Sequence, residues 1–405
     1  MITISSKVDC CGCWACYNVC PKKSISMEED NEGFRYPVVD VSTCIECGQC
    51  EKVCPIINVK PEIAVDQSAI LLQHKDAEVL KESTSGGAFT AIGEWVINQG
   101  GVVFGAAFER GTFTVKHQYV ERVEELAIYR NSKYVQSLIG DTYAEAKRFL
   151  AEGRIVCFSG TPCQIEGLVA YLRKPYENLL LIDVVCRAVP SPLLLRKYLN
   201  LKEQTNTGKY TKLYFREKYY GYKYSTFSLY NTDSKQDLHS GIESNYYLRS
   251  FFSGMAVRPS CTDCKFKKRY RQSDITIWDC FDVYKFSKEF DDDRGVTRCL
   301  IHSALGTRVA SEIGQSAKIM TIDTEAALEG VREMYHSVAV NPRRESFFND
   351  LNSLSEQECF DKYFPITIKS RVEKFIRKTM NRLGLYAIAK RTFKALFPKQ
   401  AAIKN

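Results

Sequence analysis

Two cysteine runs near the start of the chain constrain its fold and chemistry more than any other feature. Both runs have the spacing C-x2-C-x2-C-x3-C, and proline follows each of them directly. The two-residue gaps fold a tight loop that turns three thiolates toward one cubane, and the three-residue gap directs the fourth thiolate away from it. The proline, whose φ is fixed, then ends the loop. This spacing predicts two [4Fe–4S] clusters, with the fourth cysteine of each run bound to the other cluster.

The crossed arrangement divides the cysteines of the two runs into two ligand sets. The sets are Cys10, Cys13, Cys16 and Cys54, and Cys44, Cys47, Cys50 and Cys20. A zinc ribbon is the alternative, but zinc is satisfied by two CxxC pairs and needs neither the third cysteine nor the repeated proline. Cys11 falls outside the pattern and is predicted not to be a ligand. Between the runs, residues 24–43 predict a hairpin that turns near residues 31–33.

Composition bounds the cellular setting and the partners. The chain has 405 residues, 17 cysteines and a start without an apolar signal-peptide segment. Its longest apolar run, near residues 178–186, is too short to span a bilayer. Many cysteines without a leader favour the reducing cytoplasm and metal binding over disulfides. The net charge of +8 is local, because residues 366–405 carry +10 and the remaining 365 residues carry −2. We therefore expect no nucleic-acid partner.

Strand and helix patterns alternate after a linker that follows Cys54. Strands are expected at 69–74, 102–108, 155–160, 179–185, 274–278, 296–303 and 319–323. Helices are expected at 88–99, 141–153, 164–172, 307–315 and 324–334, and a further helix is expected to begin at Pro192. Ser191 is the expected cap of the helix at Pro192, and Thr324 is the expected cap of the helix at 324–334. This order predicts an α/β or α+β domain whose ligands gather at the carboxyl edge of a sheet.

Four more cysteines stand in predicted loops: Cys163, Cys186, Cys261 and Cys264. The first two follow predicted strands, whose carboxyl ends can meet at one sheet edge. Four thiolates are enough for a third [4Fe–4S] cluster. A zinc site and unrelated buried thiols are the alternatives. The other cysteines are expected to be buried thiols without a metal: Cys157, Cys280, Cys299 and Cys359.

Two polar segments are candidates for a cofactor site. Residues 83–93 begin a helix with hydroxyls and two glycines, and backbone N–H groups at such a start can bind a phosphate or a flavin carbonyl. A simple serine cap is the alternative. Residues 130–140 add Lys133, Tyr134 and Gln136, which are polar groups of flavin-contact type. An ordinary polar strand would have the same composition.

These motifs occur in an order that resembles the coenzyme F420 hydrogenase/dehydrogenase beta-subunit family. The segments are STSGGAFTA, SKYVQS, FSGTPCQIEGL, DVVC, RPSC and SDITIWD, and GTPCQIEGL is the most specific. The similarity covers about residues 10–310. It implies a flavoprotein in which FAD exchanges hydride with the deazaflavin F420 or another reducible substrate, while iron–sulfur clusters pass single electrons. Relatives with ferredoxin heads also occur as chlorophyll-pigment reductases and in bacterial polysaccharide-synthesis loci.

The resemblance also implies site residues and a division into domains. It places Ser85, Gly86, Gly87, Lys133, Tyr134, Gln136 and Thr161 near flavin, and an inner cluster on Cys163, Cys186, Cys261 and Cys264. The expected fold is a bacterial ferredoxin-like domain (1–61), a mixed-sheet α+β or α/β flavin-binding domain in two parts (62–145 and 146–340), and a helical basic tail (341–405).

The sequence departs from the family at two positions. Arg187 and Ala188 stand where the family usually has His and Gly, and Trp278 begins a segment that is usually GDFWG-like. Loss of that glycine removes both its φ > 0 conformation and room for a ligand, which argues against deazaflavin use. Arg187 is expected either to bind an anionic substrate or to form a surface salt bridge.

Two further segments have competing interpretations. Residues 209–230 hold seven tyrosines and predict an edge hairpin, with a stacking surface for a ring-shaped substrate as the alternative. In the basic tail, apolar residues fall on one helical face: Val372, Phe375, Ile376, Leu383 and Tyr386. A solvated helix and a peripheral anchor at the inner face of the membrane are the two interpretations.

The sequence as a whole predicts a cytoplasmic oxidoreductase. Electrons from ferredoxin or another redox protein would pass through the head clusters and the inner cluster to FAD and a small organic substrate. An electron-transfer subunit without its own substrate and a structural iron–sulfur protein without flavin are the alternatives. No motif indicates a catalytic acid, since none of the five histidines lies in these motifs.

Overall fold

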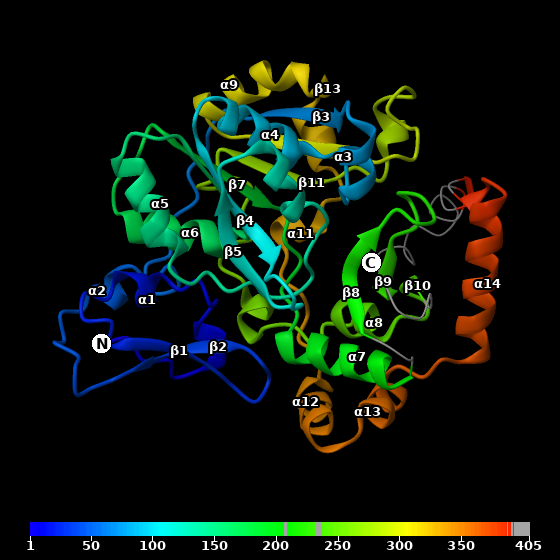
Figure 1. The fold of residues 1–405 in the computed structure, drawn as a ribbon, viewed down its shortest axis with the longest axis horizontal. Coiled ribbons are helices and arrows are strands. Elements are labelled where there is room, and N and C mark those ends of the chain that lie inside the picture. The colour runs from blue at the N-terminus through cyan, green and yellow to red at the C-terminus, as the bar shows by residue number, and fades with distance from the viewer. Residues whose placement is uncertain (206–208, 232–236, 387, 390–391, 393–405) are drawn as a thin grey trace. The chain divides into compact units, whose positions relative to one another are not determined.

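The computed structural model describes residues 1–205, 209–231, 237–386, 388–389 and 392 (Figure 1). The chain divides into two compact units. The first comprises Met1–Leu193, Val257–Asp291 and Gly295–Ala339, and the second Leu194–Ala256, Asp292–Arg294 and Val340–Asn405. Part of the expected basic tail, namely residues 387, 390–391 and 393–405, lies outside the described residues.

A β-hairpin joins the two cysteine runs at the N-terminal end of the first unit. Strand β1 (Ile25–Glu29) pairs antiparallel with β2 (Arg35–Val39). Asp30 Oδ1 accepts the backbone N–H groups of Glu32 and Phe34, and Gly33 supplies the positive φ of the turn. The predicted hairpin at residues 31–33 is confirmed.

A large mixed sheet forms the body of the first unit (Figure 1). Its strand order is β13-β3-β12-β11-β7-β6-β4-β5. The four central strands run parallel and are β4 (Val102–Phe108), β6 (Val156–Gly160), β7 (Leu179–Val184) and β11 (Ile275–Asp279). The outer strands pair antiparallel and are β3 (Ser68–His74), β5 (Val115–Val120), β12 (Thr297–Ile301) and β13 (Ala317–Ile322). The sequence expectation of a mixed α/β fold is confirmed.

Helices cover both faces of this sheet, so neighbouring strand residues enter different cores. Val103 packs with α4 (Ala88–Asn98) and α9 (Ala304–Glu312) on one face. Phe104 packs with α5 (Thr142–Ala151) and α6 (Pro162–Leu172) on the other. The second core also contains Ala15 of the head helix α1 (Ala15–Val19). The cysteine-rich head is therefore packed directly on the α5 and α6 side of the sheet.

The second unit combines a small sheet with several helices. Strands β8 (Tyr210–Glu217), β9 (Thr226–Asn231) and β10 (Leu238–Ser240) form it in the order β10-β9-β8. The antiparallel pairing of β8 with β9 confirms the tyrosine-rich hairpin. The helices are α7 (Pro192–Thr205), α8 (Tyr246–Phe252), α12 (Arg344–Ser353), α13 (Glu356–Tyr363) and α14 (Ile368–Arg382). Among the described helices of the chain, none is long and apolar enough to cross a membrane.

The single helix predicted at 324–334 is wrong. The segment forms two short helices, α10 (Thr324–Leu328) and α11 (Arg332–Tyr335). The cap of the first is Asp323, whose side chain accepts the backbone N–H of Ala326. Gly330 lies between the two helices with φ +72°, a left-handed conformation that interrupts helical hydrogen bonding.

Candidate iron–sulfur centres

The two cysteine runs fold into loops with the same backbone conformations. Gly12 and Glu46 occupy equivalent positions and have φ values of 69° and 52°. Trp14 and Gly48, also equivalent, have φ values of 65° and 67° and act as left-handed caps of α1 and α2 (Gln49–Lys52). The third cysteine of each run consequently lies in the short helix that follows. The sequence repeat is thus matched by a structural repeat.

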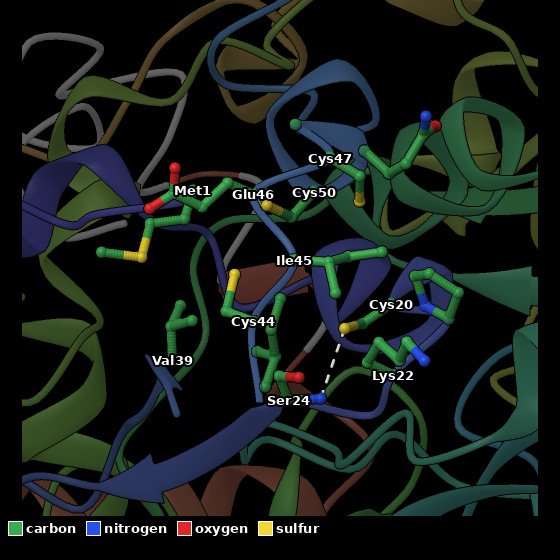
Figure 2. Close-up of a pocket in the computed structure, with 14 residues that line it drawn as sticks. Met1, Cys20, Lys22, Ser24, Val39, Cys44, Ile45, Glu46, Cys47 and Cys50 are labelled. Atoms are coloured by element: carbon green, nitrogen blue, oxygen red, sulfur yellow. Dashed lines mark hydrogen bonds between the residues drawn. The ribbon is translucent and has the colours of Figure 1, made fainter. Parts of the chain in front are cut away.

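One pocket of the head is lined by Cys44, Cys47 and Cys50 together with Cys20 from the other run (Figure 2). Backbone N–H groups point at two of these sulfurs. The N–H of Ile2 donates to Cys50 Sγ over 3.2 Å, and that of Ser24 donates to Cys20 Sγ over 3.3 Å. N–H donors of this kind stabilise thiolates and tune cluster potential. Cys47 is exposed, so this pocket reaches the surface.

A second pocket is lined by the other crossed set. Its cysteines are Cys10, Cys13, Cys16 and Cys54, with Cys11 beside them. Burial raises the pKa of the Cys54 thiol to about 11 and also raises the pKa of Cys10 and Cys16. In both pockets four cysteine sulfurs are the donor set that a [4Fe–4S] cluster requires. Among the described residues, no three His, Cys, Asp or Glu side chains are grouped to hold a single metal ion.

The fully buried Arg258 connects the second pocket to the hairpin and to the 130–140 segment. Its guanidinium donates to Cys10 O (2.8 Å), Gln136 Oε1 (2.9 Å) and Arg35 O (3.0 Å), and to the sulfur of Cys10 (3.4 Å). It also lies over the ring of Tyr36, 4.3 Å from the centroid. One cation therefore holds the first cysteine loop, the hairpin and the 130–140 segment together.

Cys11 lies between the head and the inner cysteines. Its side chain is within hydrogen-bonding reach of both Cys13 and Cys163. The two hydrogen bonds that the Cys11 thiol makes lower the pKa of Cys13 and that of Cys163. Sequence spacing predicts that Cys11 is not a ligand but gives no sign of this bridging position, because the spacing of one run does not show what packs against it.

The four loop cysteines come together at the carboxyl edge of the parallel strands. Cys163 follows β6 at the start of α6, and Cys186 follows the neighbouring strand β7. Cys261 and Cys264 come from a 3₁₀ turn and the residue after it. Burial, together with smaller effects of the neighbouring Cys163 and Cys264, raises the pKa of Cys261 to about 12. The thiols are thus close enough to affect one another electrostatically.

Positive charge surrounds these inner cysteines. Lys267 Nζ donates to the backbone carbonyls of Cys186 and Arg187. Burial raises the pKa of both Cys186 and Cys264, and the Lys267 charge offsets part of that rise. The Arg258 charge acts on Cys163 and Cys261 in the same sense. A cluster with four thiolate ligands is anionic, and these cations fit such a group. The donor set and its charge environment therefore suit the third predicted cluster.

The residues that the resemblance places near flavin are distributed over two places. Ser85 and Gly86 are tied to β12: Ser85 Oγ donates to Val296 O and Gly86 N–H to Thr297 Oγ1. A Cβ on Gly86 would overlap Leu72 O, so this glycine serves close backbone packing. Gly87 caps α4 in the left-handed conformation.

The remaining residues of that set lie on the side of the cysteines. Gln136 Nε2 donates to Cys11 O, and Thr161 Oγ1 lies 3.1 Å from Cys163 Sγ. Lys133 Nζ donates to two backbone carbonyls, and burial lowers its pKa to about 7. Tyr134 is half-buried in the same segment. Ser85, Gly86, Lys133, Gln136 and Thr161 thus use polar groups in bonds within the protein.

The two departures from the family pattern have structural roles. Arg187 Nη1 lies 3.2 Å from Glu333 Oε1, a salt bridge that is one of the two roles expected for Arg187. Trp278 lies in β11 and packs against the core formed with Leu300 and Leu328. The four cysteines expected to be buried without a metal are indeed buried: Cys157, Cys280, Cys299 and Cys359.

Comparisons with known proteins follow the same division. Residues 153–327 match the family described as the C terminus of the coenzyme F420 hydrogenase/dehydrogenase beta subunit, and residues 9–57 match the 4Fe-4S dicluster domain. The first match contains the four inner cysteines and the second contains both cysteine runs. The fold and these loops define an iron–sulfur protein with an N-terminal 4Fe-4S ferredoxin domain on a mixed α/β body. These two matches confirm the resemblance to the coenzyme F420 hydrogenase/dehydrogenase beta-subunit family with an N-terminal ferredoxin domain.

Individual relatives are similar over shorter stretches. NADH-quinone oxidoreductase subunit I 2 of Geobacter metallireducens is 40% identical over 60 residues, which is 14% of this chain and 46% of that protein. An uncharacterised ferredoxin of Methanocaldococcus jannaschii is 38% identical over 52 residues, 13% of this chain and 66% of that protein. The chain thus spans about half the length of the first relative. A chain of the F420-reducing [NiFe] hydrogenase complex of Methanosarcina barkeri aligns with 14% identity and a TM-score of 0.47, over 76% of this chain and 96% of that one.

Proposed function

We propose that this protein is an iron–sulfur oxidoreductase that carries electrons from ferredoxin or another redox protein through two head clusters to an inner cluster. The ligands would be the two crossed sets of the head and the four loop cysteines. The observation that carries the proposal is the position of Cys11, whose side chain reaches both Cys13 and Cys163. A ligand of a head cluster and a ligand of the inner cluster are thus separated by a single thiol, and electron transfer requires such proximity.

The exposure of the two head pockets supports a direction for this path. Cys47 is exposed, whereas Cys13 is buried beside α6. A donor protein can therefore approach the pocket of Cys20, Cys44, Cys47 and Cys50, and the other head pocket lies between it and the inner cysteines. The backbone N–H donors at one head pocket and the Arg258 donor at the other stabilise negative charge added to these clusters.

The family resemblance adds FAD and a reducible organic substrate as the final electron acceptors. The substrate would be coenzyme F420 or a compound of bacterial polysaccharide synthesis. A flavin joins one-electron clusters to a two-electron substrate. The structure adds no support for this part, because Ser85, Gly86 and Gln136 already bond within the protein. An electron-transfer subunit without its own substrate therefore fits the geometry equally well.

Anaerobic reduction by ferredoxin tests the proposed path. Wild-type protein should show three reduced clusters by electron paramagnetic resonance. Cys186→Ser should lose the inner-cluster signal and keep both head signals, and Cys299→Ser, at a buried thiol away from the pockets, should behave like wild type. Reoxidation by small molecules without a partner protein would separate a reductase from an electron-transfer subunit. Head clusters that become reduced while the inner cluster stays oxidised, or inner cysteines that bind no cluster, would contradict the proposal.

A further inference from the structure

The helix α14 of the second unit carries its apolar residues on the outside. Ile368, Val372, Phe375 and Ile376 lie on one side of the helix at spacings of four, three and one residues, and they are 80%, 50%, 71% and 52% exposed. The helix has no buried residue. An apolar stripe on a surface helix ordinarily faces the core of its own protein. In α14 the apolar stripe faces away from the core of its own unit.

The opposite side of α14 is polar and makes the contacts with its own unit. Glu373 pairs with Arg377 at 2.7 Å, and both side chains are half-buried. The Lys378 ammonium lies over the Tyr220 ring, 5.2 Å from the centroid. The hydrophilic side therefore faces the β8–β9 region, which explains why the apolar stripe is left outside.

Positive charge surrounds the exposed stripe. The helix carries a single acid, Glu373, and six basic residues: Lys369, Arg371, Lys374, Arg377, Lys378 and Arg382. Lys369 and Arg371 are exposed and border the stripe on its two sides. Long basic side chains in this position reach headgroup phosphates while their stems and the apolar stripe lie deeper. A second copy of the chain is disfavoured as occupant, because apposed α14 helices would repel one another electrostatically.

We propose that α14 binds this protein to the surface of an anionic membrane, with the stripe of Ile368, Val372, Phe375 and Ile376 inserted at the level of the headgroups. The charge pattern selects anionic lipid, and the exposed apolar area supplies the insertion. The binding is peripheral and reversible, since one short amphipathic helix provides far less apolar burial than a spanning segment. It does not depend on the proposed electron path.

Vesicle flotation of the purified full-length protein tests this inference. The protein should float with vesicles of phosphatidylcholine and phosphatidylglycerol at low salt, and high salt or pure phosphatidylcholine should abolish flotation. Phe375→Asp should weaken binding at least roughly tenfold, and Lys369→Gln about fivefold, the loss of one basic contact. Ile63→Asp is the matched control, because Ile63 is 69% exposed but lies in the linker after the head. It should float like wild type.

Three results would overturn the inference. The first is failure to float with anionic vesicles at low salt. The second is equal flotation of wild type and Phe375→Asp. The third is concentration-dependent self-association that Phe375→Asp abolishes in protein that does not bind vesicles, which would assign the stripe to a second copy. Because Phe375 is exposed, unchanged circular dichroism and iron content should confirm that the variant folds.

Discussion

Replacement of Arg258 by methionine should weaken the attachment of the first cysteine loop. Methionine retains much of the apolar stem but has no hydrogen-bond donor. Cys10 O and Arg35 O would therefore each lose the hydrogen bond that the Arg258 guanidinium donates to them. A buried acceptor left unpaired costs about 1–3 kcal/mol, and both carbonyls lose a charged donor. We therefore expect the free energy of unfolding to fall by roughly 3–5 kcal/mol.

The same change should alter a cluster potential. Arg258 donates to Cys10 Sγ at 3.4 Å, and a cation beside a cluster stabilises its more negative, reduced state. Loss of about 1.4 kcal/mol of this stabilisation corresponds to about 60 mV for one electron. The midpoint potential of one head cluster should thus fall by roughly 60 mV in Arg258→Met. Arg258→Lys keeps the charge and should recover most of the potential but little of the stability, since lysine lacks the planar fork.

Anaerobic denaturation and a redox titration by electron paramagnetic resonance provide the two measurements. Val41→Met, at an exposed apolar position of the head, is the control. An Arg258→Met protein that keeps its clusters with an unchanged potential would refute the electrostatic role. Equal potentials in the methionine and lysine variants would show that packing, and not charge, sets the potential.

Three further substitutions are expected to have distinct effects. A Cβ on Gly167 would lie 2.8 Å from Cys13 Cβ, so Gly167→Ala should cost about 1–3 kcal/mol and reduce iron in the first head cluster, whereas Gly314→Ala, with open space around it, should do neither. Cys11→Ser should leave iron per chain unchanged, which chemical iron analysis would check, and a loss of about four iron would instead make Cys11 a ligand. Burial lowers the pKa of His302 to about 3. Between pH 6.5 and pH 3 this histidine is protonated in the unfolded chain but not in the folded one. The free energy of unfolding should therefore decrease as the pH is lowered through this range, by up to about 1.4 kcal/mol per pH unit. His302→Gln should reduce this dependence in anaerobic denaturation measured at several pH values.

Local sequence signals predict the local features well. The hairpin turn at Gly33, the helix start after Gly87 and the strands that precede Cys163 and Cys186 depend on neighbouring residues, so they follow from pattern and turn chemistry. The helix expected at 324–334 is wrong because the conformation of Gly330 and the cap at Asp323 override the apolar spacing.

Contacts between distant segments could not be predicted from such signals. Arg258 stands in the RPSC segment, but its role depends on the hairpin and the 130–140 segment, which lie far away in sequence. Spacing places Cys11 outside the repeat, but its position between two cysteine sets depends on how α1 packs on α6. The exposure of the apolar face of α14 likewise depends on which side of the helix packs against the rest of the second unit, and the sequence of the helix does not show this.

Iron, acid-labile sulfide and flavin per chain, measured on protein purified without oxygen, test the central claim most directly. The proposed path predicts about twelve iron and about twelve sulfide in wild type, and about eight of each in Cys186→Ser, because only the inner cluster is lost. Flavin measured in the same sample decides whether the family expectation of FAD applies to this chain. About eight iron in wild type, unchanged by Cys186→Ser after reconstitution, would contradict the inner cluster and end the proposed path at the head.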